Sequence, residues 1–203
     1  MNFDGMWAEP GSDPREALET GMGEKAVLAE NLDLASRASA YVTGQMGEKA
    51  VLAEYLDRYR MTFELKCEGL TAEQLATRSV SPSTLSLLGM LRHLARVEHS
   101  WTRRVFEGQI ELPLLYRTEE DPDLDFNHAV ADDDVVAEAW DTWRGEVAHA
   151  RAVYTALDLN APVDLHGQEV ETRDIVGHLV EEYARHVGHS DLLRECIDGR
   201  TGQ

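Results

Sequence analysis

The sequence predicts an all-α protein built as a four-helix bundle, with an extension at its N-terminus. Four long segments carry apolar residues at every third or fourth position, which is the spacing of an amphipathic helix. No run of residues shows a convincing strand alternation, and the connections are long enough to cross over a bundle. The 203 residues, 43% hydrophobic and 28% charged, suffice for one globular domain with a sizeable core.

The N-terminal region differs from the rest in composition and contains a repeat. Residues 1–20 are rich in Gly, Pro and Asp and are expected to form a mobile arm. The segment Met22–Asp33 returns as Met46–Asp57 with a single difference, and two copies are too few for a solenoid. A tandem duplication, or a natural start at the second copy, explains the repeat. We therefore predict a mobile extension over residues 1–45 and a folded bundle over residues 46–203.

The first two helices follow from apolar spacing and from the residues that end them. The first is predicted from Glu48 to Cys67, and Gly69 fits its end. A short helical turn is expected at residues 70–75, where Thr71 is a suitable cap. The second long helix is predicted from about Thr84 to Glu107, and a glycine follows it.

An acidic connection separates the first pair of helices from the second. Residues 109–132 are expected to be too polar to pack, and long enough to form a rim or a lid. The third helix is predicted from Asp133 to Leu157, with acidic residues in its first turn that complement the helix dipole. The fourth is predicted to be capped by Thr172 and to reach about Asp198, directly before Gly199.

The net charge bears on the possible partners, and the cysteines and the apolar runs bear on the cellular location. A formal net charge of −19 would repel nucleic acids and anionic membranes, so neither is expected as a partner. Cys67 and Cys196 match no metal or redox spacing and are expected to be reduced thiols. The sequence shows neither a signal peptide nor an apolar run of about 18 residues. We therefore expect a cytoplasmic protein.

The fourth helix carries the most informative polar residues. Glu182 and His186 are one turn apart and lie within an apolar stripe on the same side of the helix, formed by Ile175, Leu179, Leu193 and Ile197. A carboxylate and an imidazole at core positions are costly to desolvate unless something pairs with them. A metal ion pairs with both, and residues spaced i, i+4 are close enough to share one ion.

A third metal ligand has to come from another helix. His93 lies on the face of the second helix that also carries Trp101. His99 lies on another face, and we expect it either to be exposed or to support the metal ligands without binding the metal itself. The remaining histidines outside the fourth helix are expected to be solvated: His128, His149 and His166. Two histidines and one carboxylate would leave coordination positions open, as in reactive sites. The alternative is a purely structural bundle, in which Glu182 pairs with an arginine.

Two motifs give the sequence a family resemblance. They are Leu91-x-His-Leu-Ala-x-Val-Glu-x-x-Trp101 and Glu182-Tyr-Ala-Arg-His-x-Gly-His-x-Asp-Leu-Leu-Arg-Glu195. Together they resemble the DinB-like superfamily over about residues 46–199, and most closely its actinobacterial branch related to mycothiol-dependent maleylpyruvate isomerase and thiol S-transferases. The resemblance implies an up-down-down-up four-helix bundle, a divalent metal at one end, and frequent homodimers.

The resemblance also assigns roles to individual residues. Many members use three histidines; here Glu182 replaces one, as in the His, Glu, His set of the mycothiol-dependent isomerase. The implied metal ligands are His93, Glu182 and His186. The flanking His178 and His189 are candidates for a supporting or proton-transferring catalytic role. The candidates for substrate binding are Trp101 and Arg194.

The expected function is a divalent-metal-dependent thiol S-transferase or isomerase that uses mycothiol as its thiol and acts on a small electrophilic substrate. Zinc is the expected metal, with nickel and ferrous iron as alternatives. Two other functions stay open, namely a non-catalytic metal-binding stress protein and a metal-assisted hydrolase. The sequence therefore leaves open whether the protein is an enzyme, and it names neither the substrate nor the metal.

Overall fold

The computed structural model describes residues 47–165 and 167–201. The predicted extension, residues 1–45, lies outside the described residues together with the first copy of the repeat. Its predicted mobility and the domain boundary after residue 45 therefore stay predictions.

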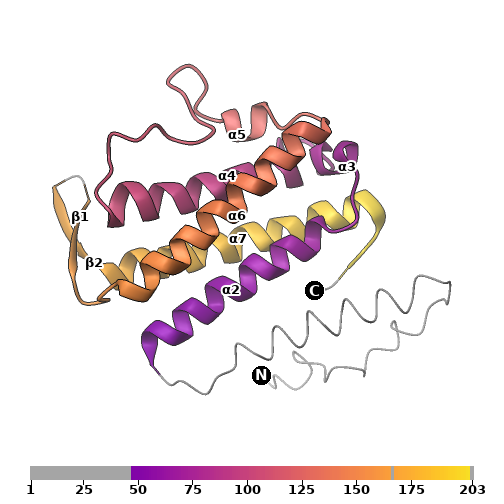
Figure 1. Cartoon of the computed structure of the whole chain (residues 1–203). Coiled ribbons are helices and arrows are strands. Elements are labelled where there is room, and N and C mark those ends of the chain that lie inside the picture. Colours follow the sequence, from indigo (N-terminus) through magenta and orange to yellow (C-terminus); the bar gives the residue numbers. More distant parts are fainter. Residues whose placement is uncertain (1–46, 166, 202–203) are drawn as a thin grey trace, which may run out of the picture. The chain divides into compact units, whose positions relative to one another are not determined.

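Four long helices form the bundle, as the sequence predicts (Figure 1). They are α2 (Glu48–Cys67), α4 (Leu87–His99), which continues directly into the π-helix η2 (Ser100–Phe106), α6 (Asp133–Ala156) and α7 (Thr172–Asp198). Smaller elements connect them: α3 (Ala72–Ala76), α5 (Leu124–Asn127), β1 (Pro162–Leu165) and β2 (Gln168–Glu171). The bounds of α2 are those expected from the sequence. α7 ends where expected, but it already includes Thr172, and Glu171 takes the cap position expected for that threonine. These helices confirm the all-α fold class.

The first and last long helices run side by side in the same direction. Near their starts, Glu48 of α2 pairs with Arg173 of α7 at 2.9 Å. Near their ends, Lys66 of α2 pairs with Asp191 of α7 at 2.6 Å. Because both ends of one helix meet the matching ends of the other, α2 and α7 are parallel neighbours.

The two middle helices are also parallel to each other and run against the outer pair. Arg92 of α4 lies 3.8 Å from Glu138 of α6, and Arg103 of η2 lies 2.8 Å from Glu146 of α6. Two ion pairs, Asp57–Arg151 and Glu64–Arg144, show that α2 and α6 run antiparallel. The bundle is therefore of the up-down-down-up type, and its parallel middle pair requires the long crossover that the acidic connection provides.

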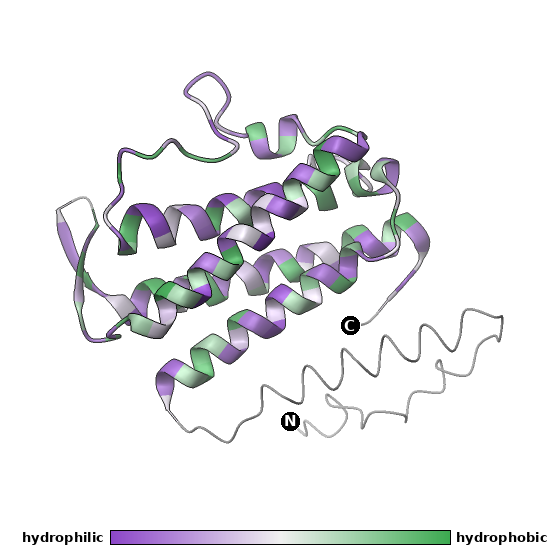
Figure 2. Cartoon of the chain, in the orientation of Figure 1, coloured by the Kyte–Doolittle hydropathy of each residue, from purple (hydrophilic) through white to green (hydrophobic). Residues whose placement is uncertain are grey.

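The core lies between these helices and is built from their apolar faces. In Figure 2 each long helix carries both hydrophobic and hydrophilic segments, as amphipathic helices do. The largest fully buried side chains include Phe63, Leu91, Leu94, Leu179, Tyr183 and Leu193. Each such aliphatic or aromatic side chain contributes about 1.5–3 kcal/mol by leaving water. No helix in the described ranges is long and apolar enough to cross a membrane.

Two features were not expected from the sequence. The π-helix η2 replaces the last turns of a predicted α-helix, and the β1–β2 hairpin occupies part of a predicted loop. The strands are only four residues long, and of their facing pairs only Val163↔Val170 is apolar on both sides. Strands of four residues are too short to give a recognisable alternation.

The acidic connection packs against α4, so the expectation that it is too polar to pack is wrong around α5. Asp125 is 0% exposed. The buried Arg92 of α4 donates hydrogen bonds to the backbone carbonyls of Leu124 and Asp125 at 3.4 and 3.2 Å. Polar groups of the two segments satisfy one another, which a criterion based on polarity alone does not detect.

Gly89 of α4 is where α5 approaches this helix most closely. A Cβ at this position would lie 2.6 Å from Phe126 Cδ1 and 3.2 Å from Phe126 Cα. We expect Gly89→Ala to lower the free energy of unfolding by about 1–3 kcal/mol, because the backbone of α5 has to move. Urea unfolding measures the effect.

The matched control is Gly145→Ala on α6, where no neighbouring atom of residues 47–165 or 167–201 lies within 4 Å of an added Cβ. This variant should be more stable than wild type by about 0.5–1 kcal/mol, since alanine favours helix over glycine. Equal shifts of the two variants in the same direction would contradict the close approach of α5.

Candidate metal centre

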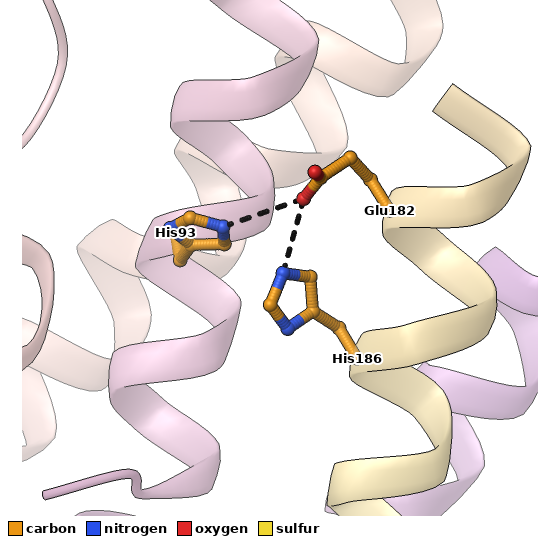
Figure 3. Close-up of side chains that lie close together, drawn as sticks. All are labelled: His93, Glu182 and His186. Carbon is orange, nitrogen blue, oxygen red and sulfur yellow. Dashed lines mark hydrogen bonds and ion pairs between the residues drawn. The ribbon is translucent and has the colours of Figure 1, made fainter. Parts of the chain in front are cut away.

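Three side chains from two helices converge between α4 and α7. Each of His93, Glu182 and His186 offers one atom that can bind a metal, and these atoms all lie within 4.8 Å of one another (Figure 3). Glu182 Oε2 is 3.1 Å from His186 Nε2 and 3.9 Å from His93 Nε2. Within the described residues this is the only group of three or more such side chains with this spacing.

The fold explains why these three residues meet. Glu182 and His186 are one turn apart on α7, and the antiparallel α4 brings His93 opposite them. The rings of His93 and His186 are in edge-to-face contact, with centroids 4.6 Å apart. All three side chains are largely shielded from solvent, with exposed fractions of 15%, 18% and 12%.

His93 is held by a residue that sequence reasoning missed, Asp125. Its Nδ1 lies 2.9 Å from Asp125 Oδ2, and Arg96 Nη2 lies 3.1 Å from the same oxygen. Arg96 Nη2 also lies 3.0 Å from His93 Nδ1. We assign the proton to Nδ1, because the other tautomer would place the Nδ1 lone pair 2.9 Å from a carboxylate oxygen, whereas the Arg96 N–H can donate to that oxygen instead. His93 Nε2 therefore presents a lone pair toward Glu182, and it is buried with no hydrogen-bond partner in the described structure.

His186 is held in its neutral form. Burial, reinforced by the neighbouring His93, lowers the pKa of His186 to about 4, although Glu182 acts in the opposite direction. The imidazole is therefore neutral near pH 7, as metal ligation requires. It contacts Glu182 through Nε2.

The donor set fits a divalent transition metal. The ion-pair contacts of Glu182 within the described residues are with three histidines, His93, His178 and His186, and none is with an arginine. An arginine-paired Glu182, the structural alternative raised by the sequence, is therefore not what the structure contains. Two imidazoles and a carboxylate suit zinc, nickel or ferrous iron, and three ligands leave positions open.

The two flanking histidines have different surroundings. His178 Nε2 lies 3.5 Å from Glu182 Oε1, and 43% of the His178 side chain is exposed. Its ring packs edge-to-face on Trp101, with centroids 5.3 Å apart, so the predicted substrate-binding Trp101 lies next to the ligand set. The ring of His189 is 5.7 Å from that of His186, and its Nδ1 is buried with no hydrogen-bond partner in the described structure. Both histidines are partly exposed, and His178 is the one that lies against Glu182.

Arg194, the other residue predicted to bind substrate, has a different environment. It is 5% exposed, and its Nη1 donates to the carbonyl oxygens of Lys66 and Glu68 at 3.0 and 2.7 Å. Its Nη2 also pairs with Asp198 at 2.7 Å. Arg194 thus satisfies carbonyl groups at the C-terminal end of α2, which is a structural task.

His99 also differs from the expectation of an exposed residue. It is 7% exposed, and its Nε2 lies 3.2 Å from the carbonyl oxygen of Pro113 in the acidic connection. Its Nδ1 lies 3.6 Å from Glu146. His99 therefore helps to hold the connection and is not part of the three-residue group.

Comparisons with known proteins agree with this architecture. The chain matches the family model described as mycothiol-S-transferase over residues 51–199. Among solved structures it is similar to the "conserved protein of locus from Enterococcus faecalis", with a TM-score of 0.55 and 18% sequence identity. This similarity covers 77% of the present chain and 100% of the other, and at that identity it shows a shared fold. No curated protein matches the chain.

Proposed function

Because the chain belongs to the mycothiol-S-transferase family, we propose that it transfers mycothiol to a small electrophile at the centre formed by His93, Glu182 and His186. The observation that carries this proposal is the convergence of three metal-binding side chains inside the matched range of residues 51–199. We propose zinc as the metal, with nickel and ferrous iron as the alternatives that the same ligands accept.

The metal would serve to activate the thiol. Held by these three side chains, a divalent ion would leave a position for the thiol and would lower the pKa of a thiol bound there. His93 contributes a lone pair at Nε2, and Glu182 contributes the negative charge that balances the cation. The shielding of all three side chains strengthens these electrostatic interactions.

His178 is the residue we propose to move the proton. It lies beside Glu182 and is half-exposed, so it can receive the proton that the thiol loses and pass it to solvent or to the product. Trp101, which packs on His178, would form part of the wall against which the substrate lies. The sulfur then forms the new bond to the electrophilic carbon, and the leaving group takes the electron pair of the bond that breaks.

Metal removal tests the proposal. We expect the zinc-loaded protein to join mycothiol to a chlorodinitrobenzene probe, and the chelated protein to lose at least about 100-fold of this rate until zinc is restored. Zinc at 100 times its dissociation constant should also raise the free energy of unfolding by about 2.7 kcal/mol. Absorbance of the thioether product and chemical unfolding are the two measurements.

The same experiment separates the alternatives. Turnover of an ester probe without any thiol would indicate metal-assisted hydrolysis. Tight metal binding with no thiol-dependent turnover would indicate a non-catalytic metal-binding protein. Equal rates with and without metal would overturn the proposed mechanism.

A further inference from the structure

We infer that Asp125 is a positioning residue for the centre, and that it couples the docking of α5 to metal occupancy. This inference rests on the proposed metal centre, because it concerns how the chain prepares one of the three ligands. Asp125 lies in the connection between η2 and α6, 32 residues from His93 in the sequence. Nothing in its sequence context distinguishes it from the neighbouring acidic residues Glu119, Glu120, Asp121 and Asp123.

The surroundings of Asp125 are those of a carboxylate with a specific task. The residue is 0% exposed, and both of its oxygens are used. With the proton on His93 Nδ1, Oδ2 accepts from that nitrogen and from Arg96 Nη2 at 2.9 and 3.1 Å, and Oδ1 accepts from the backbone N–H of Phe126 at 3.1 Å. Arg96 Nη2 also lies 3.0 Å from His93 Nδ1, so the three groups form one cluster. A carboxylate on the second nitrogen of a metal-binding histidine fixes the tautomer and raises the basicity of the ligand.

The same face of α4 that carries His93 also holds the backbone around Asp125. Arg92 donates to the carbonyl of Asp125 at 3.2 Å, and Arg96 donates to that of Pro122 at 3.2 Å. The ring of Phe126 lies against the ring of His93, with centroids 5.5 Å apart. Undocking of α5 would therefore remove the His93 partner, so docking and ligand orientation are one event.

This linkage has a reciprocal consequence. If docked Asp125 raises metal affinity by a given factor, a bound metal must favour the docked form by the same factor. Loss of such a supporting partner typically weakens metal affinity by about 10–100-fold. Metal binding should therefore slow hydrogen exchange of the α5 amides by about 10–100-fold, since these amides exchange when α5 opens. The amides concerned are those of Phe126, Asn127 and His128, which bond within α5.

Asp125→Asn tests the positioning role. Asparagine has a single acceptor oxygen, so its NH2 group faces either the Phe126 N–H or His93, and in the second case it stabilises the tautomer with the proton on Nε2. We expect zinc affinity, measured by competition with a chromophoric chelator, to fall by about 10–100-fold. The metal-induced slowing of exchange in α5 should disappear in the same variant.

The matched control is Asp123→Asn. It removes the same charge from the same segment, but the Asp123 side chain is exposed and makes no capping hydrogen bond to α5. Zinc affinity and exchange should match wild type within about twofold, a change well below that expected for a lost supporting partner. An equal loss in both variants would overturn the specific role of Asp125.

A second measurement needs no variant. Long-range ¹H–¹⁵N spectra of the metal-free wild-type protein report which nitrogen of His93 carries the proton, and we expect Nδ1. The proton on Nε2 would overturn the inference. A wild type that binds no zinc would overturn the proposed function and the coupling with it. A wild type that binds zinc no better than Asp125→Asn would overturn the inference alone.

Discussion

Replacing His93 with alanine is expected to remove the bound divalent ion and with it the thiol transfer. His93 is the only one of the three ligands on α4, so its loss leaves a Glu–His pair on one helix. Two ligands hold a divalent ion far more weakly than three. We therefore expect the metal affinity to fall by at least about 100-fold, which exceeds the loss expected when only a hydrogen-bond partner of a ligand is removed. Elemental mass spectrometry of the purified variant measures the metal content directly.

Two comparisons make this experiment decisive. Glu182→Ala and His186→Ala should lose the ion in the same way. His149→Ala removes a histidine of α6 that pairs with Glu107 at 2.9 Å, and it should keep wild-type metal content and rate. If His93→Ala retained about one ion per chain and full activity, the ligand assignment would be wrong.

The second large effect is expected on stability, from Glu98→Ala. Glu98 is 0% exposed and accepts two hydrogen bonds from the buried Arg60 guanidinium at 2.8 and 2.9 Å. It also accepts one from the Tyr183 hydroxyl at 2.6 Å. Burial and the Glu98 carboxylate raise the pKa of Tyr183, so this hydroxyl stays a donor. Removing Glu98 leaves Asp57 as the remaining ion-pair partner of Arg60 and takes the acceptor from the Tyr183 hydroxyl, and we expect a loss of about 3–5 kcal/mol in the free energy of unfolding.

The controls for Glu98 separate charge burial from side-chain truncation. The double variant Arg60→Met with Glu98→Leu removes both charges and should recover most of the lost stability. Glu64→Ala breaks an ion pair with Arg144 whose side chains are 47% and 58% exposed, and it should cost less than about 1 kcal/mol. A Glu98→Ala variant as stable as Glu64→Ala would show that the buried network contributes little.

Much of the fold could be predicted because its signals are local. Apolar spacing, and glycines such as Gly69 and Gly199 just beyond the helix ends, determine the bounds of α2 and α7. The three candidate metal ligands could also be selected, because a charged or polar side chain within an apolar stripe is conspicuous. Their convergence is observed, and their role as ligands stays a prediction.

The features that were missed depend on contacts between distant segments. Asp125 looks like any acidic loop residue until its partner His93 is brought opposite it. Arg60 and Glu98 look like surface residues because each is charged. Only the ion pair that they form between α2 and α4 offsets the free-energy cost of burying both charges. A pattern along one helix contains no information about such pairs.

Because α2 packs against α7, the bundle can close only after the last helix has left the ribosome. The hydrogen bond from Arg194 to the Lys66 carbonyl joins residues 128 positions apart, and such distant contacts form only after the intervening chain has been synthesised. Glu182 and His186 belong to that last helix, so a nascent chain that already contains His93 still lacks two of the three ligands. Folding of the bundle and completion of the centre therefore both wait for α7, and a chain that ends before α7 acquires neither.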